Sequence, residues 1–178
     1  GNELLGLKDK SFRLTDKIKD GKVCVSQGVI AGCAGGTYDN LMSVASILNG
    51  KSVGNGEFTL NIYPGSQPAN AAIAKNGAMS VLLESGAVLK SCFCGPCFGA
   101  GDVPCNNGLS IRHTTRNFER REGSKPADGQ IASVALMDAR SIAATAANGG
   151  VLTSALGYDY DDCFEDFTYI PSVYNSRV

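Results

Sequence analysis

Short apolar runs alternate with amphipathic segments along most of the chain. The run over residues 23–31 is mostly apolar and contains β-branched residues, which is typical of a buried parallel strand. Five strands are predicted in all, over residues 23–31, 58–63, 87–90, 109–115 and 131–136. Apolar residues at the spacing of one helical face, together with polar caps and glycine stops, predict helices over 37–50, 67–75, 78–84 and 138–148. Strands that alternate with helices predict an α/β fold, a three-layer α/β/α sandwich with a mostly parallel sheet.

The two ends of the chain differ from this pattern. Residues 1–20 are charged and polar, and we interpret them as a lead-in segment at the surface. Residues 156–178 are acidic and aromatic, a composition that cannot bury itself as a regular element. We expect this tail to pack on the domain or to lead toward a following domain that the sequence does not contain.

Length and charge narrow the function classes. A chain of 178 residues is the size of one domain. With 16 Lys and Arg against 17 Asp and Glu, the net charge is −1, which argues against a broad basic surface for nucleic acid. No apolar run approaches the roughly 20 residues of a membrane span, and no signal peptide is visible at the start. These features predict a cytoplasmic protein with neither a membrane nor a nucleic-acid partner.

Cysteines and glycines are the candidates for chemistry, because the chain has 7 Cys and 22 Gly but only 1 His. Cys33 follows the first predicted strand, and the C-x-x-C pair of Cys94 and Cys97 follows the third. Ligands of open parallel sheets gather at the carboxyl ends of the strands. We therefore expect the three cysteines to face the same edge of the sheet.

The C-x-x-C pair alone leaves several interpretations open. A redox dithiol opens a helix early in a β-α-β unit, whereas this pair lies mid-chain in a loop rich in Gly, Asn and Pro. Structural zinc takes four ligands, usually from two paired knuckles, and one knuckle is present. An iron–sulfur cluster is held by cysteine thiolates. Thiols without a role remain the simplest interpretation for Cys24 and Cys163.

Four motifs, in order along residues 23–150, resemble those of the aconitase family. They are the cysteine turn 33–41 (CAGGTYDNL), the turn 63–66 (YPGS), the pair 94–97 (CGPC), and Thr115-Arg116-Asn117-Phe118 followed by Arg121. The flanking residues resemble a less characterised hydratase branch of that family. Two departures stand out, since Ala34-Gly35-Gly36 replaces the usual Thr-Asn-Ser and Thr115 replaces an Asn.

The resemblance implies a site and a reaction. Cys33, Cys94 and Cys97 would hold a [4Fe–4S] cluster whose remaining iron acts as a Lewis acid. Arg116 and Arg121 would bind substrate carboxylates, because a guanidinium pairs with a carboxylate through two parallel hydrogen bonds. Arg112, Arg120 and His113 are interpreted as surface or structural residues. Cys92 and Cys105 adjoin the ligand loop without matching a family ligand.

The resemblance also implies that the chain is a part of a larger enzyme. Residues 21–155 match only the third α/β domain of the family, the cluster domain, and the family's serine base lies on a swivelling domain with no counterpart here. We therefore expect a fragment of a hydro-lyase that acts on a hydroxy di- or tricarboxylic acid. Its partners would be that small-molecule acid and the remaining domains, and alone it would be inactive and need not retain the cluster. The alternative is a non-catalytic module for iron–sulfur or metal sensing or binding.

Overall fold

The computed structural model describes residues 13–54, 56–115, 130–160 and 165–176. Its centre is a five-stranded sheet in the order β5-β4-β3-β6-β7, in which every neighbouring pair is parallel. The strands are β3 (Gln27–Ile30), β4 (Thr59–Ile62), β5 (Val88–Leu89), β6 (Gly108–His113) and β7 (Ala132–Leu136). The predicted α/β class with a parallel sheet is confirmed, consistent with a three-layer α/β/α sandwich.

Helices connect β3 to β4 and β4 to β5, as parallel neighbours require, and a 3-10 turn lies between β5 and β6. They are α1 (Gly32–Gly35), α2 (Tyr38–Leu48), α3 (Gln67–Lys75), α4 (Ala78–Glu84), the 3-10 turn η2 (Pro96–Phe98) and α5 (Ala139–Ala147). Side chains of Thr37, Ser66 and Asp138 accept hydrogen bonds from backbone N–H groups at the starts of α2, α3 and α5. These caps explain why the predicted and observed starts of the three helices agree.

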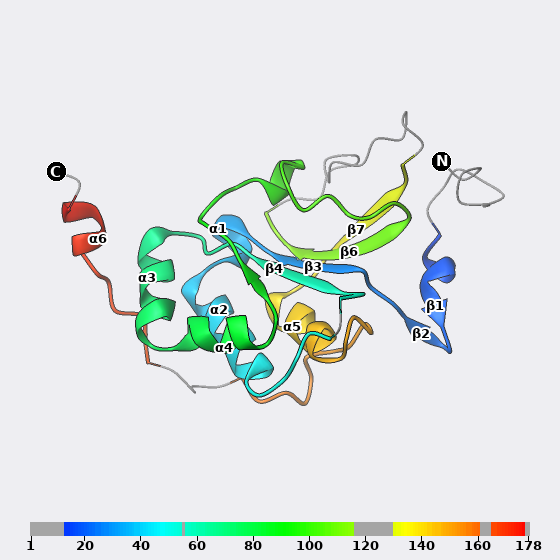
Figure 1. The fold of residues 1–178 in the computed structure, drawn as a ribbon, viewed down its shortest axis with the longest axis horizontal. Coiled ribbons are helices and arrows are strands. Elements are labelled where there is room, and N and C mark those ends of the chain that lie inside the picture. The colour runs from blue at the N-terminus through cyan, green and yellow to red at the C-terminus, as the bar shows by residue number, and fades with distance from the viewer. Residues whose placement is uncertain (1–12, 55, 116–129, 161–164, 177–178) are drawn as a thin grey trace.

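The two faces of the sheet differ in chemistry. On one face, fully buried Ile30, Leu60, Ile62 and Ile111 join the main apolar core beneath α2, α4 and α5 (Figure 1). The opposite face carries buried polar side chains, namely Gln27, Asn61, Ser110 and Arg112. Residues of the segment 90–107 hydrogen-bond to this polar face, so the connection between β5 and β6 forms its cover.

The predicted strand 23–31 is divided in the structure. Lys22–Val23 forms β2, which pairs antiparallel with β1 (Ile18–Lys19) just after the 3-10 turn η1 (Leu14–Lys17). The chain between β2 and β3 is tied to the end of α5 instead, because the Val25 N–H donates to the Gly150 carbonyl. The apolar pattern indicated burial correctly. The segment pairs first with β1 and the chain after α5, and only then with the sheet strands β4 and β6.

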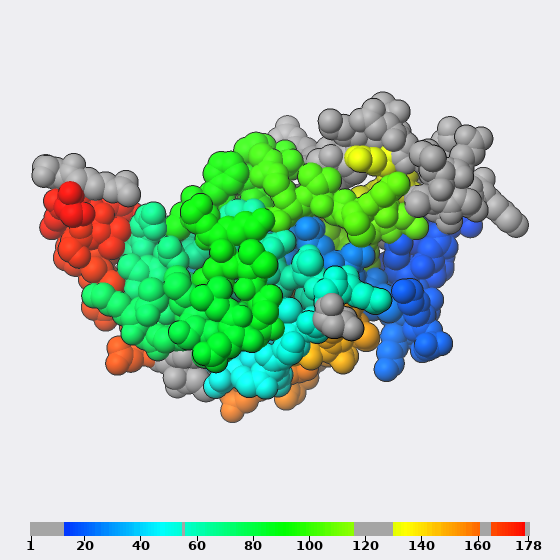
Figure 2. Space-filling view, viewed as in Figure 1, coloured from blue at the N-terminus to red at the C-terminus, as the bar shows by residue number. Residues whose placement is uncertain are grey.

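The described part of the tail lies against the helices. The ring centroids of Tyr38 and Phe167 are 5.2 Å apart, and the Tyr38 hydroxyl donates to the Glu165 carbonyl. The short helix α6 (Ser172–Asn175) lies at the opposite end of the molecule from η1 (Figure 2). Among the described residues, no helix has the length and apolar character to cross a membrane.

Candidate functional site

Cys33 lies in the turn that follows β3, the central strand. The Ala31 N–H donates to the His113 carbonyl of β6, and the Gly65 N–H donates to the Gly36 carbonyl. A Cβ on Gly35 would lie 2.0 Å from the His113 carbonyl oxygen, and one on Gly36 would lie 2.2 Å from the Tyr63 carbonyl oxygen. The glycines that replace the family's polar residues thus allow the turn to lie against the ends of β6 and β4.

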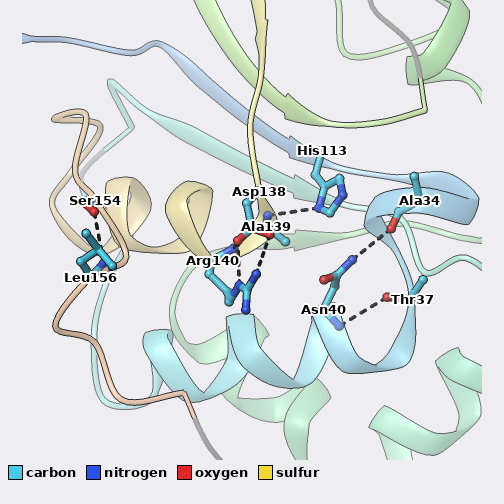
Figure 3. A network of polar contacts seen from close by, with 9 residues as sticks. All are labelled: Ala34, Thr37, Asn40, His113, Asp138, Ala139, Arg140, Ser154 and Leu156. Carbon is cyan, nitrogen blue, oxygen red and sulfur yellow. Dashed lines mark hydrogen bonds and ion pairs between the residues drawn. The ribbon is translucent and has the colours of Figure 1, made fainter.

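Asn40 fixes the other side of this turn. Its side-chain N–H donates to the Ala34 carbonyl at 3.0 Å, and its backbone N–H donates to the Thr37 hydroxyl (Figure 3). The first turn of α2 is therefore bonded directly to α1. The position of Cys33 is therefore set by hydrogen bonds on both sides of α1.

The second cysteine loop begins after β5. The Lys90 N–H donates to the Ile62 carbonyl of β4, and the chain then runs to Cys94 and η2. Two backbone N–H groups, of Phe98 and Ala100, donate to the single carbonyl of Gly95. These bonds fold residues 95–100 into a tight turn that carries Cys97.

The three predicted ligand cysteines come together in the structure. The pKa of the Cys94 thiol is raised mainly by the charge of the neighbouring Cys97 and by a hydrogen bond with it, and to a smaller extent by desolvation and by the charge of Cys33. The Cys97 sulfur lies 3.5 Å from the place that a Cβ on Gly32 would take, and Gly32 is the residue before Cys33 in the chain. Cys33 and Cys94 are exposed and Cys97 is half-buried. The site thus opens to solvent on one side.

The donor set suits an iron–sulfur cluster. Three free thiols at one edge of the sheet gain from a bound cation, because it stabilises the thiolate forms. Within the described ranges, no three His, Cys, Asp or Glu side chains gather closely enough to hold a single metal ion. A polynuclear cluster spreads its cysteine ligands over a larger body than one ion does.

Thr115 connects this site to the arginine motif. Its hydroxyl oxygen lies 3.5 Å from the sulfur of Cys33, one of the three predicted ligands. Arg116 and Arg121, predicted to bind carboxylates, lie outside the described residues, as do Arg120 and Cys163. Their placement stays a prediction.

Arg112 is a buried residue, which removes the surface alternative for it. Its side chain is 1% exposed, and its guanidinium donates to Ser110, to Gln27 and to the carbonyls of Pro96 and Asp102. The alternation of Leu109 and Ile111 with Ser110 and Arg112 places the two polar residues on one face of the strand. That pattern was available in the sequence, but nothing local indicated that a loop would cover this face.

Asp102 is a second residue that the sequence did not single out. Its carboxylate accepts hydrogen bonds from Asn61 at 2.8 Å and from Lys90 at 3.0 Å, and its side chain is 4% exposed. Burial lowers the pKa of Lys90, but hydrogen bonds to Asp102 and Tyr63 and the charges of these two residues together outweigh it and leave that pKa raised. The carboxylate thereby joins the cysteine loop to β4 and to the end of β5.

His113 is structural, as expected. Its Nδ1 accepts the backbone N–H of Ala139 at 3.1 Å, at the start of α5 (Figure 3). Next to it, two hydrogen bonds from Arg140 lower the pKa of Asp138. The imidazole nitrogen that faces α5 is occupied by the helix terminus.

Three further cysteines lie in the described residues. Cys92 is half-buried, burial raises the pKa of its thiol, and the thiol donates to the Gln67 side-chain oxygen at 3.9 Å. Cys24 lies before the amino end of β3, where its backbone forms an isolated antiparallel β-bridge with Val151. Cys105 is exposed in the segment before β6. All three are free thiols in the structure.

Comparisons with known proteins identify the family of this chain. Residues 6–144 match the model of the aconitase family (aconitate hydratase). The chain is 33% identical over 134 residues to a 3-isopropylmalate dehydratase large subunit of Clostridioides difficile and 30% identical to that of Clostridium kluyveri. Each alignment covers 75% of this chain but 31% of the relative, so the chain spans about a third of their length. The chain belongs to the aconitase family.

Proposed function

We propose that this chain is the cluster-bearing part of an aconitase-type hydro-lyase that acts on a hydroxy di- or tricarboxylic acid. The observation that supports it best is the meeting of Cys33, Cys94 and Cys97, which come from two loops at one edge of the sheet. The relatives are named 3-isopropylmalate dehydratases. Isopropylmalate is a hydroxy dicarboxylic acid, so the substrate in that name falls within the proposed class.

The residues of this chain would share two tasks. Cys33, Cys94 and Cys97 would hold a [4Fe–4S] cluster, which when bound supplies a Lewis acid for the departing hydroxyl. Arg116 and Arg121 would bind the substrate carboxylates and orient them. Thr115, which precedes Arg116 in the sequence and contacts Cys33, would join the carboxylate-binding motif to the ligand turn.

The remaining tasks would fall to other parts of a larger protein. Removal of water needs a base for the carbon-bound proton, and the family resemblance places that base on another domain. The alignments cover 31% of the relatives, which leaves room in such proteins for further domains. We propose that those domains are the partners of this chain and close the site over the substrate.

Anaerobic reconstitution with iron and sulfide tests the ligand assignment. The 178-residue chain should gain a broad visible absorbance from thiolate-to-iron charge transfer, together with bound iron and sulfide. Cys33→Ser should reduce bound iron at least about tenfold, because a weaker ligand replaces one of three thiolates. Cys24→Ser, at the other end of β3, is the matched control and should reconstitute like the unchanged chain.

The outcomes separate the candidate functions. Equal iron uptake by Cys33→Ser and the unchanged chain would contradict the ligand assignment. Zinc uptake without iron would favour a structural metal site. A stable cluster in a parent protein whose spectrum no hydroxy acid perturbs would favour the alternative sensing or binding module.

A further inference from the structure

Arg112 bonds the cysteine loop to the sheet at two points. It projects from the polar face of β6, and its guanidinium donates to the Pro96 carbonyl at 3.1 Å and to the Asp102 carbonyl. Pro96 lies inside the C-x-x-C pair, and Asp102 lies six positions after Pro96. The two contacts thus enclose Cys97, one on each side.

Two side chains of the polar sheet face, Ser110 and Gln27, hold the guanidinium in place. The Ser110 hydroxyl accepts from its Nε at 3.0 Å, and the Gln27 side-chain oxygen accepts from one terminal nitrogen at 3.1 Å. Ser110 in turn donates to Gln27 at 2.8 Å. A planar guanidinium presents its donors in a fixed fork. The contacts with Ser110 and Gln27 therefore determine where the N–H groups that reach the loop point.

Besides Arg112, hydrogen bonds of the Asp102 carboxylate also hold the loop. The Asp102 carboxylate bonds to Asn61 of β4 and to Lys90 after β5, so the far end of the loop is held at two places besides Arg112. The near end, by contrast, is bonded through Pro96 to Arg112. Loss of Arg112 would therefore release the part of the loop that carries Cys94 and Cys97 while the Asp102 end stays attached.

We propose that Arg112 is a positioning residue, which holds the loop of Cys94 and Cys97 in the shape that receives the cluster before any cluster is bound. The cluster itself rests on the proposed function, whereas the loop's dependence on Arg112 does not. Hydrogen bonds from a charged donor in a buried setting are among the strongest in proteins, so a pair of them can order a short loop. The free energy of cluster binding is then not reduced by the cost of ordering that loop.

The test measures the loop in the metal-free chain. In Arg112→Gln, Cys97 should react with iodoacetamide about tenfold faster, since the loss of charged hydrogen bonds exposes a half-buried thiol. Amide exchange of Phe98 and Ala100 should accelerate together with it. Cys33, already exposed, and half-buried Cys24 should change less than about twofold. Arg140→Gln, at an exposed arginine paired with Asp138, is the matched control.

Arg112→Lys distinguishes positioning from a general loss of stability. Lysine keeps the charge but presents no planar fork for two carbonyls. We expect it to retain the slow amide exchange of β3 and β4 and to give an intermediate rate at Cys97. Unchanged Cys97 labelling and loop exchange in both variants would overturn the proposal. So would equal acceleration at every cysteine in Arg112→Lys, because that pattern marks global unfolding.

A second readout separates this inference from the proposed function. After reconstitution, a chelator should remove iron about tenfold faster from Arg112→Gln than from the unchanged chain. If the unchanged chain takes up no iron, the cluster assignment fails in isolation, and the labelling data still decide the role of Arg112. If iron binds and both variants release it at the unchanged chain's rate, the positioning role fails while the cluster assignment stands.

Discussion

Gly35→Ala is expected to lower the free energy of unfolding by about 3 kcal/mol, the upper end for overpacking. The added methyl group would lie 2.0 Å from the His113 carbonyl oxygen, which belongs to the backbone of β6 and cannot rotate away. Either the cysteine turn or the end of β6 must move. Urea denaturation measures the loss, and reconstitution of the folded fraction should show reduced iron uptake because Cys33 moves with the turn.

Gly50→Ala is the matched control for this prediction. Gly50 has a φ of +69°, and a Cβ there would meet nothing within 4 Å. The same substitution should cost only the backbone term of a left-handed residue, about 1 kcal/mol, and leave iron uptake unchanged. If Gly35→Ala costs no more than Gly50→Ala, the turn of Cys33 does not lie against β6 as described.

The reconstituted 178-residue chain is expected to turn over neither citrate, isocitrate nor an isopropylmalate. The reaction needs a base at the substrate carbon, and the family resemblance places that base outside this chain. His113 does not replace it, because its Nδ1 accepts the Ala139 N–H at the start of α5. Formation of the unsaturated acid, followed by its ultraviolet absorbance, measures the rate.

A positive control makes that absence of turnover interpretable. A parent protein that contains this chain with its further domains should show turnover under the same anaerobic conditions. Arg116→Lys and Arg121→Lys in that parent should raise KM, because a lysine cannot form the paired bonds of a guanidinium with carboxylate. Turnover by the isolated chain at the parent's rate would contradict the division of tasks proposed above.

Local signals were sufficient to predict most of the fold. The predicted bounds of α3 and α4 agree with the observed ones, and the structure shows that Ser66 caps the first and that Gly77, with a φ of +87°, precedes the second in a left-handed turn. Apolar runs bounded by glycine and proline likewise identified the strands. The parallel order of those strands then brought Cys33, Cys94 and Cys97 to one edge.

Contacts between distant segments account for what the sequence could not predict. The burial of Arg112 depends on Pro96 and Asp102, which a loop carries over the polar face of the sheet. The need for glycine at position 35 arises from the carbonyl of His113, far along the chain. Neither relation has a local pattern, because each joins residues that only the folded sheet brings together.

Iron stoichiometry of the reconstituted chain under mild oxidation tests the central claim most directly. Three cysteine ligands leave one iron of a cubane without a protein thiolate, and that iron should leave first. We predict about four irons per chain, of which about one is released on mild oxidation while the absorbance largely persists. Cys33→Ser should not reach this state. Release of all iron in one step, or no iron uptake by a folded chain, would contradict the three-cysteine cluster site.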